Sequence, residues 1–370
     1  MSTSGLEPSP APTAPEPHPA LQTRLCELAG VRYPIVQTGM GWVAGARLVA
    51  ATANAGGLGI LASATMTFEE LERAVGEVRD RTEAPFGVNM RTDVEDVAKR
   101  VDLLVDQGVR VASFAQAPRP DTVAKLRDAG VVVIPTIGAR RHAEKVASWG
   151  VDGVIAQGAE GGGHTGQVPT SLLVPQVVDA VGSDVAVVAA GGFNDGRGLV
   201  AALAWGAAGI AMGTRFLLTQ ESTVPDEVKK VYLGTPVTGT VVTTRVDGAP
   251  QRVVRTAAVD HLDGAGRLTA LPRALRNALA FRRQTNTSMR ALVREGLAMK
   301  KGNDLSWAQV VMAANAPMMT RAALVEGRTD VGILPTGQVV GVIEELPTVA
   351  ELVSRIVIEA NETLARLTAS

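Results

Sequence analysis

The sequence has very few aromatic residues, a single cysteine and almost no net charge. Aromatic side chains make up 3% of its 370 residues, which argues against a surface that stacks on nucleic-acid bases. The net charge of -1 gives no global field that would select a polyanion or a membrane. The cysteine, Cys26, has no partner for an internal disulfide. We expect it to be a small buried hydrophobic residue in a reducing compartment.

Signals for export and for membrane insertion are also missing. The first twenty residues contain six prolines and no basic residue, whereas a signal peptide needs a basic start and an apolar stretch. No apolar run approaches the ~18 residues of a membrane-spanning helix. We therefore expect residues 1–20 to form a disordered tail, because they have nothing to bury. The sequence predicts a cytoplasmic protein with no membrane or nucleic-acid partner.

What the sequence does contain is a regular alternation of short apolar runs and amphipathic stretches. Several runs, such as VVVIPT and VAVVAA, are continuously apolar, which is typical of parallel strands covered on both faces. Eight β units joined by helices predict an α/β fold, the TIM (β/α)8 barrel, with an open doubly wound sheet as the alternative. The expected strands are residues 35–38, 58–61, 86–89, 109–114, 131–136, 153–157, 185–189 and 209–212.

The alternation ends near Pro225. Residues 225–335 are polar, rich in Arg and Met, and mostly helical in pattern, and the chain then returns to an apolar run and a final helix. We therefore predict that residues 21–224 and 336–370 form the barrel. Residues 225–335 would form a smaller, mainly helical substrate domain inserted after the eighth strand.

A glycine-rich stretch follows the first expected strand. Residues 39–44 read G-x-G-x-x-A, the spelling of a dinucleotide-binding turn. That turn needs an acidic residue about 20 positions further on to hold a ribose. The first acid after Gly39 is Glu69, 30 positions away, so the fingerprint is incomplete. We interpret the stretch as a barrel loop in which Gly39 and Gly41 allow a flat ligand to approach the backbone.

Two further glycine loops follow the seventh and eighth expected strands. In barrels these two loops commonly bind a phosphate through main-chain N–H groups. Gly191-Gly192 and Gly213-Thr214 occupy these places, and Thr214 adds a hydroxyl donor. The alternative is that the glycines only make tight turns. No Walker lysine pattern is present, which argues against a nucleoside triphosphate.

His164 follows three consecutive glycines in the loop after the sixth expected strand. An imidazole there can accept or donate a proton at the catalytic face of a barrel, so His164 is the candidate catalytic residue. Its alternative role is to cap the next helix. No metal site is expected, because no H-x-x-x-H or Cys/His cluster surrounds it. A G-x-S-x-G elbow is absent too, which argues against a serine hydrolase.

A phosphate cradle, a glycine-lined first loop and one histidine together suit flavin mononucleotide (FMN). Its phosphate would bind at loops seven and eight, and its ring would span the mouth of the barrel. Asn89 and Gln157 end the third and sixth expected strands. Their amides would either hydrogen-bond the ring or cap a helix.

The segments with these features resemble a known family. PIVQTGMGWVAGARLVAATANAGGLGIL, PFGVN, GVDGVIAQGAEGGGHTG, VVAAGGFNDGRG and MGTRFL are similar to segments of the nitronate monooxygenase family, and the pattern is shared by flavin-type enoyl-acyl carrier protein reductases. The resemblance runs from about residue 22 to the C-terminal helix. It implies an FMN-bound TIM barrel, an inserted substrate domain, a homodimer, and His164 as acid/base beside flavin N5. The implied flavin contacts are Gly39, Met40, Asn89, Gln157, Gly162, Gly163, Gly191, Gly192, Gly213, Thr214 and Gln338.

A narrower resemblance extends into the insertion. GMGWVAGARLV, STVPDEVKKVYL, GTVVTTRVDG and WAQVVMAAN are similar to the actinobacterial flavoproteins of steroid C/D-ring degradation, which act on hexahydroindanone-type acyl-CoA thioesters. This likeness implies oxidation or reduction of a cyclic acyl-CoA near its thioester.

A basic segment independently favours a substrate of that size. Residues 267–301 hold nine Arg or Lys and one acid. On a continuous helix Arg276, Arg283, Arg290 and Arg294 would share one face, since each residue turns by about 100°. Guanidinium groups pair well with phosphate, so this face would bind CoA; the alternative is a solvated helical face.

Three other functions remain open from the sequence. A nitronate monooxygenase would convert alkyl nitronates with O2 into a carbonyl compound and nitrite. An enoyl-thioester reductase would consume NAD(P)H. A non-catalytic acyl-CoA or flavin-binding protein would bind these ligands without turnover.

Overall fold

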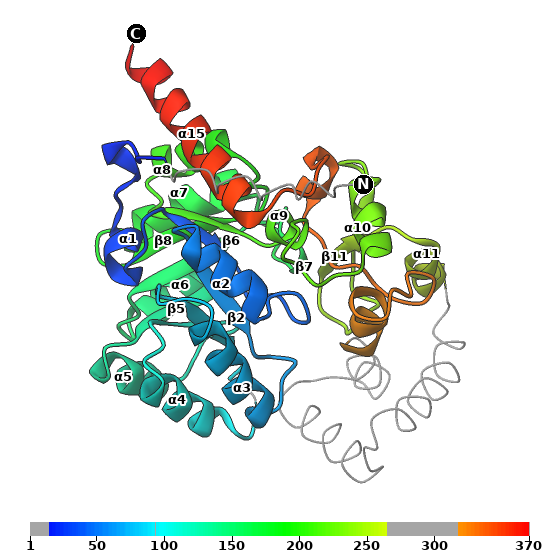
Figure 1. The fold of residues 1–370 in the computed structure, drawn as a ribbon, viewed down its shortest axis with the longest axis horizontal. Coiled ribbons are helices and arrows are strands. Elements are labelled where there is room, and N and C mark those ends of the chain that lie inside the picture. The colour runs from blue at the N-terminus through cyan, green and yellow to red at the C-terminus, as the bar shows by residue number, and fades with distance from the viewer. Residues whose placement is uncertain (1–14, 93, 265–316, 370) are drawn as a thin grey trace, which may run out of the picture.

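The computed structural model describes residues 15–92, 94–264 and 317–369. Eight parallel strands close into a barrel in the order β1-β2-β3-β4-β5-β6-β8-β9, and β9 pairs back onto β1 (Figure 1). The predicted TIM barrel is therefore confirmed. Its strands are β1 (Ile35–Gln37), β2 (Leu58–Ala62), β3 (Gly87–Met90), β4 (Val111–Phe114), β5 (Val132–Ile137), β6 (Gly153–Gln157), β8 (Ala186–Ala190) and β9 (Gly209–Met212).

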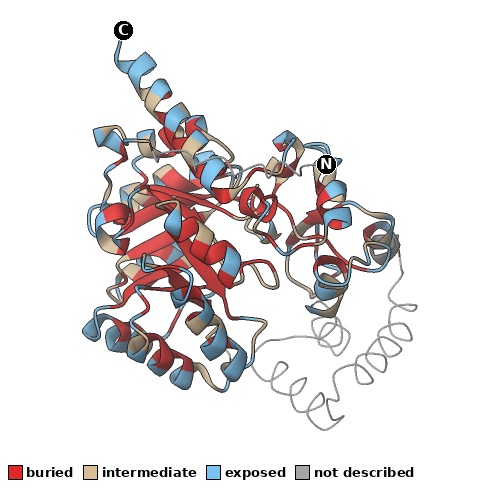
Figure 2. Cartoon of the chain, in the orientation of Figure 1, coloured by how far each residue is buried: buried red, intermediate tan, exposed pale blue. Residues whose placement is uncertain are grey.

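Helices follow the strands and cover the outside of the barrel. Apart from the short helix after β9, which is buried, their outward faces are exposed while the strands are buried (Figure 2), as the amphipathic sequence pattern predicts. Among the helices in the described ranges, none combines the length and apolar character needed to cross a bilayer. The helices of this layer are α2 (Ala46–Asn54), α3 (Phe68–Arg79), α4 (Val97–Asp106), α5 (Pro120–Asp128), α6 (Arg140–Ala147), α7 (Thr170–Val181), α8 (Gly196–Ala204), the short α9 (Thr214–Leu217) and α15 (Val349–Thr368).

Local sequence signals start two of these helices. Thr67 caps α3 and Thr348 caps α15, and in each case a glutamate three residues later completes a capping box. The final helix α15 packs against α8 and α2 and completes the outer wall. The expectation of a closing C-terminal helix is thus confirmed.

The N-terminal end of the barrel is closed by α1 (Arg24–Ala29). Leu25 and Ala29 are buried in one cluster with inward-facing residues of the strands. Thr23 Oγ1 donates to the Ala208 carbonyl at 2.5 Å, just before β9, which fixes α1 at the start of the strands. Cys26, on the same helix, is buried as the sequence predicts.

The chain before α1 lies against the barrel from residue 15 onward. A 3-10 helix, η1 (Pro19–Leu21), precedes α1. The His18 amide donates to Asn361 Oδ1 of α15 at 2.9 Å, and Tyr33 Oη donates to the Pro15 carbonyl at 2.6 Å. Residues 15–20 of the segment expected to be a disordered tail are thus hydrogen-bonded to the body of the protein. Residues 1–14 lie outside the described residues.

The described part of residues 225–335 contains helices and a hairpin beside the mouth of the barrel. They are α10 (Asp226–Leu233), β10 (Thr240–Thr243), β11 (Gln251–Val254) and α11 (Ala257–Gly264), and residues 317–324 are helical as well. Since residues 265–316 lie outside the described residues, a mainly helical substrate domain over 225–335 stays a prediction. A short 3-10 helix, η2 (Gln338–Val342), leads the chain back to the barrel.

The close contact between α8 and α15 provides a test of the packing. A Cβ on Gly196 would lie 2.3 Å from the Ala360 amide nitrogen, so Gly196→Ala should lower the Tm through a loss of about 1–3 kcal/mol. Gly76, on α3, has open space around its position, and Gly76→Ala should stabilise by about 0.5–1 kcal/mol. Thermal unfolding of both variants checks this; equal shifts would contradict the close packing of α8 and α15.

Candidate active site

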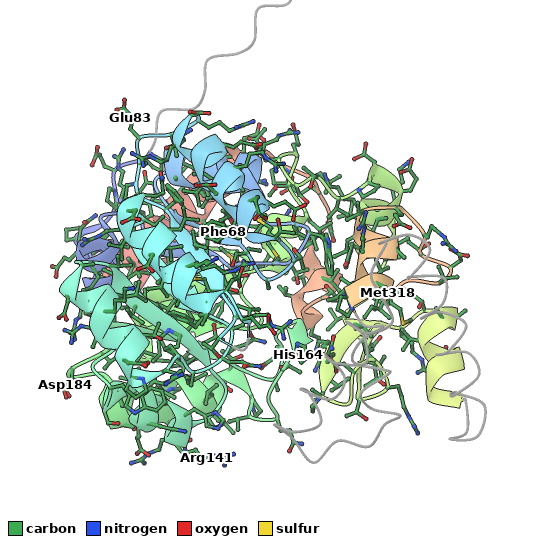
Figure 3. All side chains as sticks on the ribbon, turned by 90° about the horizontal axis from the view of Figure 1, so that it is seen from below. Phe68, Glu83, Arg141, His164, Asp184 and Met318 are labelled. Atoms are coloured by element: carbon green, nitrogen blue, oxygen red, sulfur yellow. The ribbon has the colours of Figure 1, made fainter. Side chains whose placement is uncertain are left out.

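The residues predicted to bind a cofactor gather at one end of the barrel. Parallel barrels carry their active sites at the carboxyl ends of the strands. Gly39 and Met40 follow β1; Asn89 lies in β3; Gln157 ends β6, with Gly162 and Gly163 in the loop beyond; Gly191 and Gly192 follow β8; Gly213 and Thr214 follow β9; and Gln338 begins η2. His164 lies where the barrel meets the inserted segment (Figure 3).

The loop after β1 contacts the neighbouring loops closely. A Cβ on Gly39 would lie 2.4 Å from the Cβ of Asn89, so only glycine fits there. A Cβ on Gly213 would lie 3.4 Å from the sulfur of Met40. Trp42, in the same loop, has a φ of 61°, a strained conformation for a bulky residue of the kind that clusters at functional sites. The first and eighth loops therefore form one continuous surface.

The loops after β8 and β9 present main-chain N–H groups. Gly191 and Gly192 have φ values of 103° and 84°, in the region that favours glycine. Within the described residues, the amides of Gly191, Gly192, Gly213 and Thr214 donate to no loop or turn carbonyl. Successive free amides with such dihedral angles form a concave anion-binding nest.

The hydroxyl of Thr214 joins this nest to the segment that returns from the insertion. Its Oγ1 accepts the Gly337 amide at 2.8 Å and the Thr336 hydroxyl at 3.4 Å. A threonine oxygen that accepts two hydrogen bonds still has its own O–H to donate. Gln338 follows Gly337, and its main-chain amide donates to the Glu160 carbonyl at 2.9 Å. Thr214 is thus held in place with one free donor.

The loop after β6 is fixed at several points. Gln157 Nε2 donates to the main-chain carbonyl of His164 at 2.7 Å. Arg252 donates to the Ala159 carbonyl at 3.1 and 3.3 Å, and Glu160 Oε2 accepts both the amide and the hydroxyl of Thr170. The backbone that carries His164 is therefore well defined.

Asn89 and Gln157 are predicted to bind the flavin ring, but their side-chain NH2 groups already donate to other protein groups. Asn89 Nδ2 donates to Ser113 Oγ at 3.2 Å, and Gln157 donates as described above. Their side-chain oxygens accept no hydrogen bond within the described part of the chain. Flavin contacts from Asn89 and Gln157 therefore stay a prediction, with the amide oxygens as the available groups.

A short strand connects the loop after β6 to the inserted hairpin. β7 (Gly163–His164) pairs antiparallel with β11, and His164 lies opposite Gln251. β11 also pairs with β10, so one three-stranded sheet combines barrel and insertion (Figure 1). The sheet fixes the position of His164 relative to the insertion.

The imidazole of His164 contacts a carboxylate that the sequence did not predict. His164 Nε2 lies 2.8 Å from Oδ2 of Asp247, in the loop between β10 and β11. Gln251 Nε2 donates to the same oxygen at 2.5 Å, and the Ala249 amide donates to Oδ1 at 3.1 Å. The Asp247 side chain is only 12% exposed, whereas His164 is 66% exposed. The Nε2 side of the imidazole is thus held by Asp247, and the rest of the ring is accessible to solvent.

The environment of Asp247 favours its ionised form. Burial by itself would raise the pKa of this carboxyl, but the hydrogen bond and charge of His164, with the donors of Ala249 and Gln251, lower it below its usual value. A lowered pKa in the folded state stabilises the fold above the unfolded pKa of about 3.9. That stabilisation is lost as the pH falls through the folded pKa.

Two further predictions concern the basic segment and the absence of a metal site. Arg276, Arg283, Arg290 and Arg294 lie outside the described residues, so CoA binding by this basic segment stays a prediction. Across the described ranges, no three His, Cys, Asp or Glu side chains group as metal ligands would.

Comparison with known proteins identifies similar chains. The family model described as "Nitronate monooxygenase" matches residues 22–100 and 94–359. Two curated proteins, from Mycobacterium tuberculosis and Rhodococcus jostii, share the name (3aS,4S,5R,7aS)-5-hydroxy-7a-methyl-1-oxo-octahydro-1H-indene-4-carboxyl-CoA dehydrogenase. They are 58% identical over 341 residues and 60% identical over 340 residues; each alignment covers 92% of this chain and 96% of the relative.

A solved structure agrees with the observed fold. FabK from Thermotoga maritima superimposes with a TM-score of 0.75 at 32% sequence identity. The superposition covers 94% of this chain and 99% of that protein. The similarity therefore includes most of the chain beyond the barrel strands.

Proposed function

The chain belongs to the nitronate monooxygenase family and is an oxidoreductase, and on this premise we propose that it is an FMN-dependent dehydrogenase of a cyclic acyl-CoA thioester. The substrate class is a hydroxylated methyl-oxo-indane-carboxyl-CoA, as in the names of its relatives, which fits a role in steroid ring degradation. The observation that carries this proposal is 58–60% identity over 92% of the chain. Coverage this wide includes most of residues 225–335, where substrate choice is expected to reside.

The residues at the barrel mouth fit a flavin with a single phosphate. The nest at Gly191, Gly192, Gly213 and Thr214 offers free donors to that phosphate, and the Thr214 hydroxyl adds one more. A Cβ on Gly39 would clash with Asn89, so glycine lets the loop after β1 lie directly against β3. We propose that the ring is held by residues from the other loops: Gly39, Met40, Asn89, Gln157, Gly162, Gly163 and Gln338.

Dehydrogenation removes two hydrogens, and His164 accounts for one of them. When bound, a flavin supplies two-electron oxidation, in which one hydrogen leaves a substrate carbon as a hydride. The second hydrogen leaves as a proton, and we assign its acceptor to His164 Nδ1. Nε2 is occupied by Asp247, so Nδ1 is the ring nitrogen with an available lone pair. In the reverse direction the same nitrogen donates the proton.

Anaerobic titration of the FMN-loaded protein tests this function. The hydroxylated indane-carboxyl-CoA thioester should bleach the flavin absorbance in proportion to the substrate added. Nitrite release from alkyl nitronates with O2, without bleaching by the thioester, would instead support a nitronate monooxygenase. NAD(P)H oxidation with enoyl thioesters would support a reductase, and binding without any flavin turnover would support a non-catalytic protein.

The hydroxyl of Thr214 provides a more local test. Thr214→Val removes the free O–H and should weaken FMN binding by about tenfold to a hundredfold, since a hydrogen bond to a charged group contributes about 1.5–3 kcal/mol. Thr214→Ser keeps the hydroxyl and should bind FMN almost as the wild type does. Quenching of FMN fluorescence measures both affinities, and equal affinities would exclude the hydroxyl as a phosphate ligand.

We further propose that the protein is a cytoplasmic homodimer. The buried thiol of Cys26 is compatible with a reducing compartment, and the dimer follows from the family resemblance. Light scattering of the purified protein measures the oligomeric state, and a monomer would contradict this part of the proposal.

A further inference from the structure

We propose that Asp247 is a positioning residue, which fixes the tautomer and orientation of His164 for proton transfer at Nδ1. Asp247 belongs to the inserted segment, whereas His164 belongs to the barrel. The inference rests on the proposed function, because it takes His164 as the proton acceptor. It adds that the insertion supplies part of the acid–base apparatus besides any contact with substrate.

The contact between the two side chains sets the tautomer. Asp247 Oδ2 lies 2.8 Å from His164 Nε2, and an ionised carboxylate only accepts hydrogen bonds. Nε2 therefore carries a hydrogen, and in the neutral imidazole the lone pair is on Nδ1. In the opposite tautomer, Nε2 and the carboxylate would face each other as two acceptors. Asp247 thus favours the form of His164 that can take a proton at Nδ1.

Asp247 is itself held in place by other residues of its hairpin. Gln251 and the Ala249 amide donate to its two oxygens, so neither oxygen is free to rotate toward solvent. Gln251 Nε2 lies 3.2 Å from His164 Nε2, farther than either nitrogen lies from the shared Oδ2 acceptor. Because Gln251 is paired directly with His164 between β11 and β7, the backbone register brings all three side chains together.

The other charged side chains on these elements are directed elsewhere or exposed. Arg252 donates to the Ala159 carbonyl and to Thr240, and Glu160 accepts from Thr170. Arg245, in the same loop as Asp247, is exposed to solvent. In the described part of the chain, Asp247 is the charged group that forms an ion pair with the imidazole. An effect of this carboxylate on His164 can therefore be measured by changing one residue.

The competing explanation is that Asp247 only docks the hairpin onto the barrel. A contact that served only for docking would affect thermal stability, whereas a positioning role also predicts a lower kcat in folded protein. The nitrogen spectrum of His164 tests the tautomer on which the positioning role depends, and the turnover of folded Asp247 variants separates the two explanations.

The experiment uses FMN-loaded protein with ¹⁵N-labelled histidine. The chain has four histidines, and the spectrum of His164→Gln identifies the signals of His164. In the wild type we expect neutral His164 to carry its hydrogen on Nε2. In Asp247→Asn we expect the Nδ1-protonated form to become populated, because the carboxylate that accepts the hydrogen on Nε2 is lost. Asp260→Asn is the matched control, since that carboxylate pairs with Arg255 on the exposed side of α11.

Kinetics provide the second measurement. Asp247→Asn should lower kcat by about tenfold to a hundredfold with little change in KM, since general-base catalysis contributes about 10²–10⁴-fold. Asp247→Glu should restore part of the rate. If Asp247→Asn does not fold, Gln251→Leu replaces it. We expect the same changes in the tautomer of His164 and in kcat, but smaller ones.

The outcomes separate this inference from the proposed function. An unchanged tautomer of His164 in the Asp247 and Gln251 variants would overturn the positioning role, even if His164→Gln is inactive. Full activity of His164→Gln would overturn the proton-transfer role of His164, whatever the nitrogen spectra show.

Discussion

Replacing His164 with alanine should lower kcat by about 10²–10⁴-fold while FMN remains bound, because the variant loses the proton acceptor and keeps the phosphate nest. The main-chain carbonyl of residue 164 still accepts the Gln157 amide, so the loop should keep its conformation. Steady-state turnover of the acyl-CoA thioester and the flavin absorbance spectrum measure the two properties in one sample.

His142→Ala is the matched control for this variant. His142 is exposed on α6, and its replacement should leave both turnover and flavin content unchanged. If His164→Ala turned over at the wild-type rate, the proton would have to leave to another group or to water. If it lost FMN instead, His164 would have to be reassigned as a binding residue.

Gly192→Asp should weaken FMN binding by at least about a hundredfold. The φ of 84° is tolerated by Asp and Asn better than by other side chains, and the nearest atom to a new Cβ is 3.6 Å away, on Glu160. A carboxylate beside a phosphate repels it. At an effective dielectric constant of 20, two like charges 4 Å apart repel by about 4 kcal/mol.

Gly192→Asn has nearly the same shape without the charge. It should retain most of the FMN affinity, so the difference between the two variants isolates the electrostatic effect. Fluorescence titration with FMN at low and high salt measures this difference, which should shrink as salt screens the charges. Equal affinities would place the phosphate away from the loop after β8.

The barrel could be predicted because its strands are marked locally. The runs at residues 153–157 and 209–212 coincide with β6 and β9, and each ends at a polar or glycine-rich loop. Strands buried on both faces need continuous apolar residues, so the sequence itself delimits them. Their number, eight, then favours closure over an open sheet, and the structure confirms it.

The sheet at the barrel mouth could not be predicted in this way. β7 consists of a glycine and a histidine, neither of which has a strong preference for strands. Its strand conformation comes from pairing with β11, almost ninety residues later in the chain. A sequence pattern of period two cannot be recognised in two residues, so tertiary contact decides the structure here.

The partner of His164 could not be predicted for the same reason. Asp247 lies in the segment GTVVTTRVDG, where an aspartate before glycine is typical of an ordinary turn. Only the register between β7 and β11 brings it to the imidazole. Gln157 also has a role that its sequence context does not predict: its amide holds the backbone of the loop after β6.

The origin of Asp247 has a consequence for engineering new specificity. A chimera that exchanges residues 225–335 for the corresponding segment of another family member would also exchange the carboxylate that hydrogen-bonds His164. Such a graft would change the proton chemistry of the recipient together with its choice of substrate. A transplant meant to alter only specificity should therefore keep the recipient's own β10–β11 hairpin and replace the sequence that follows it.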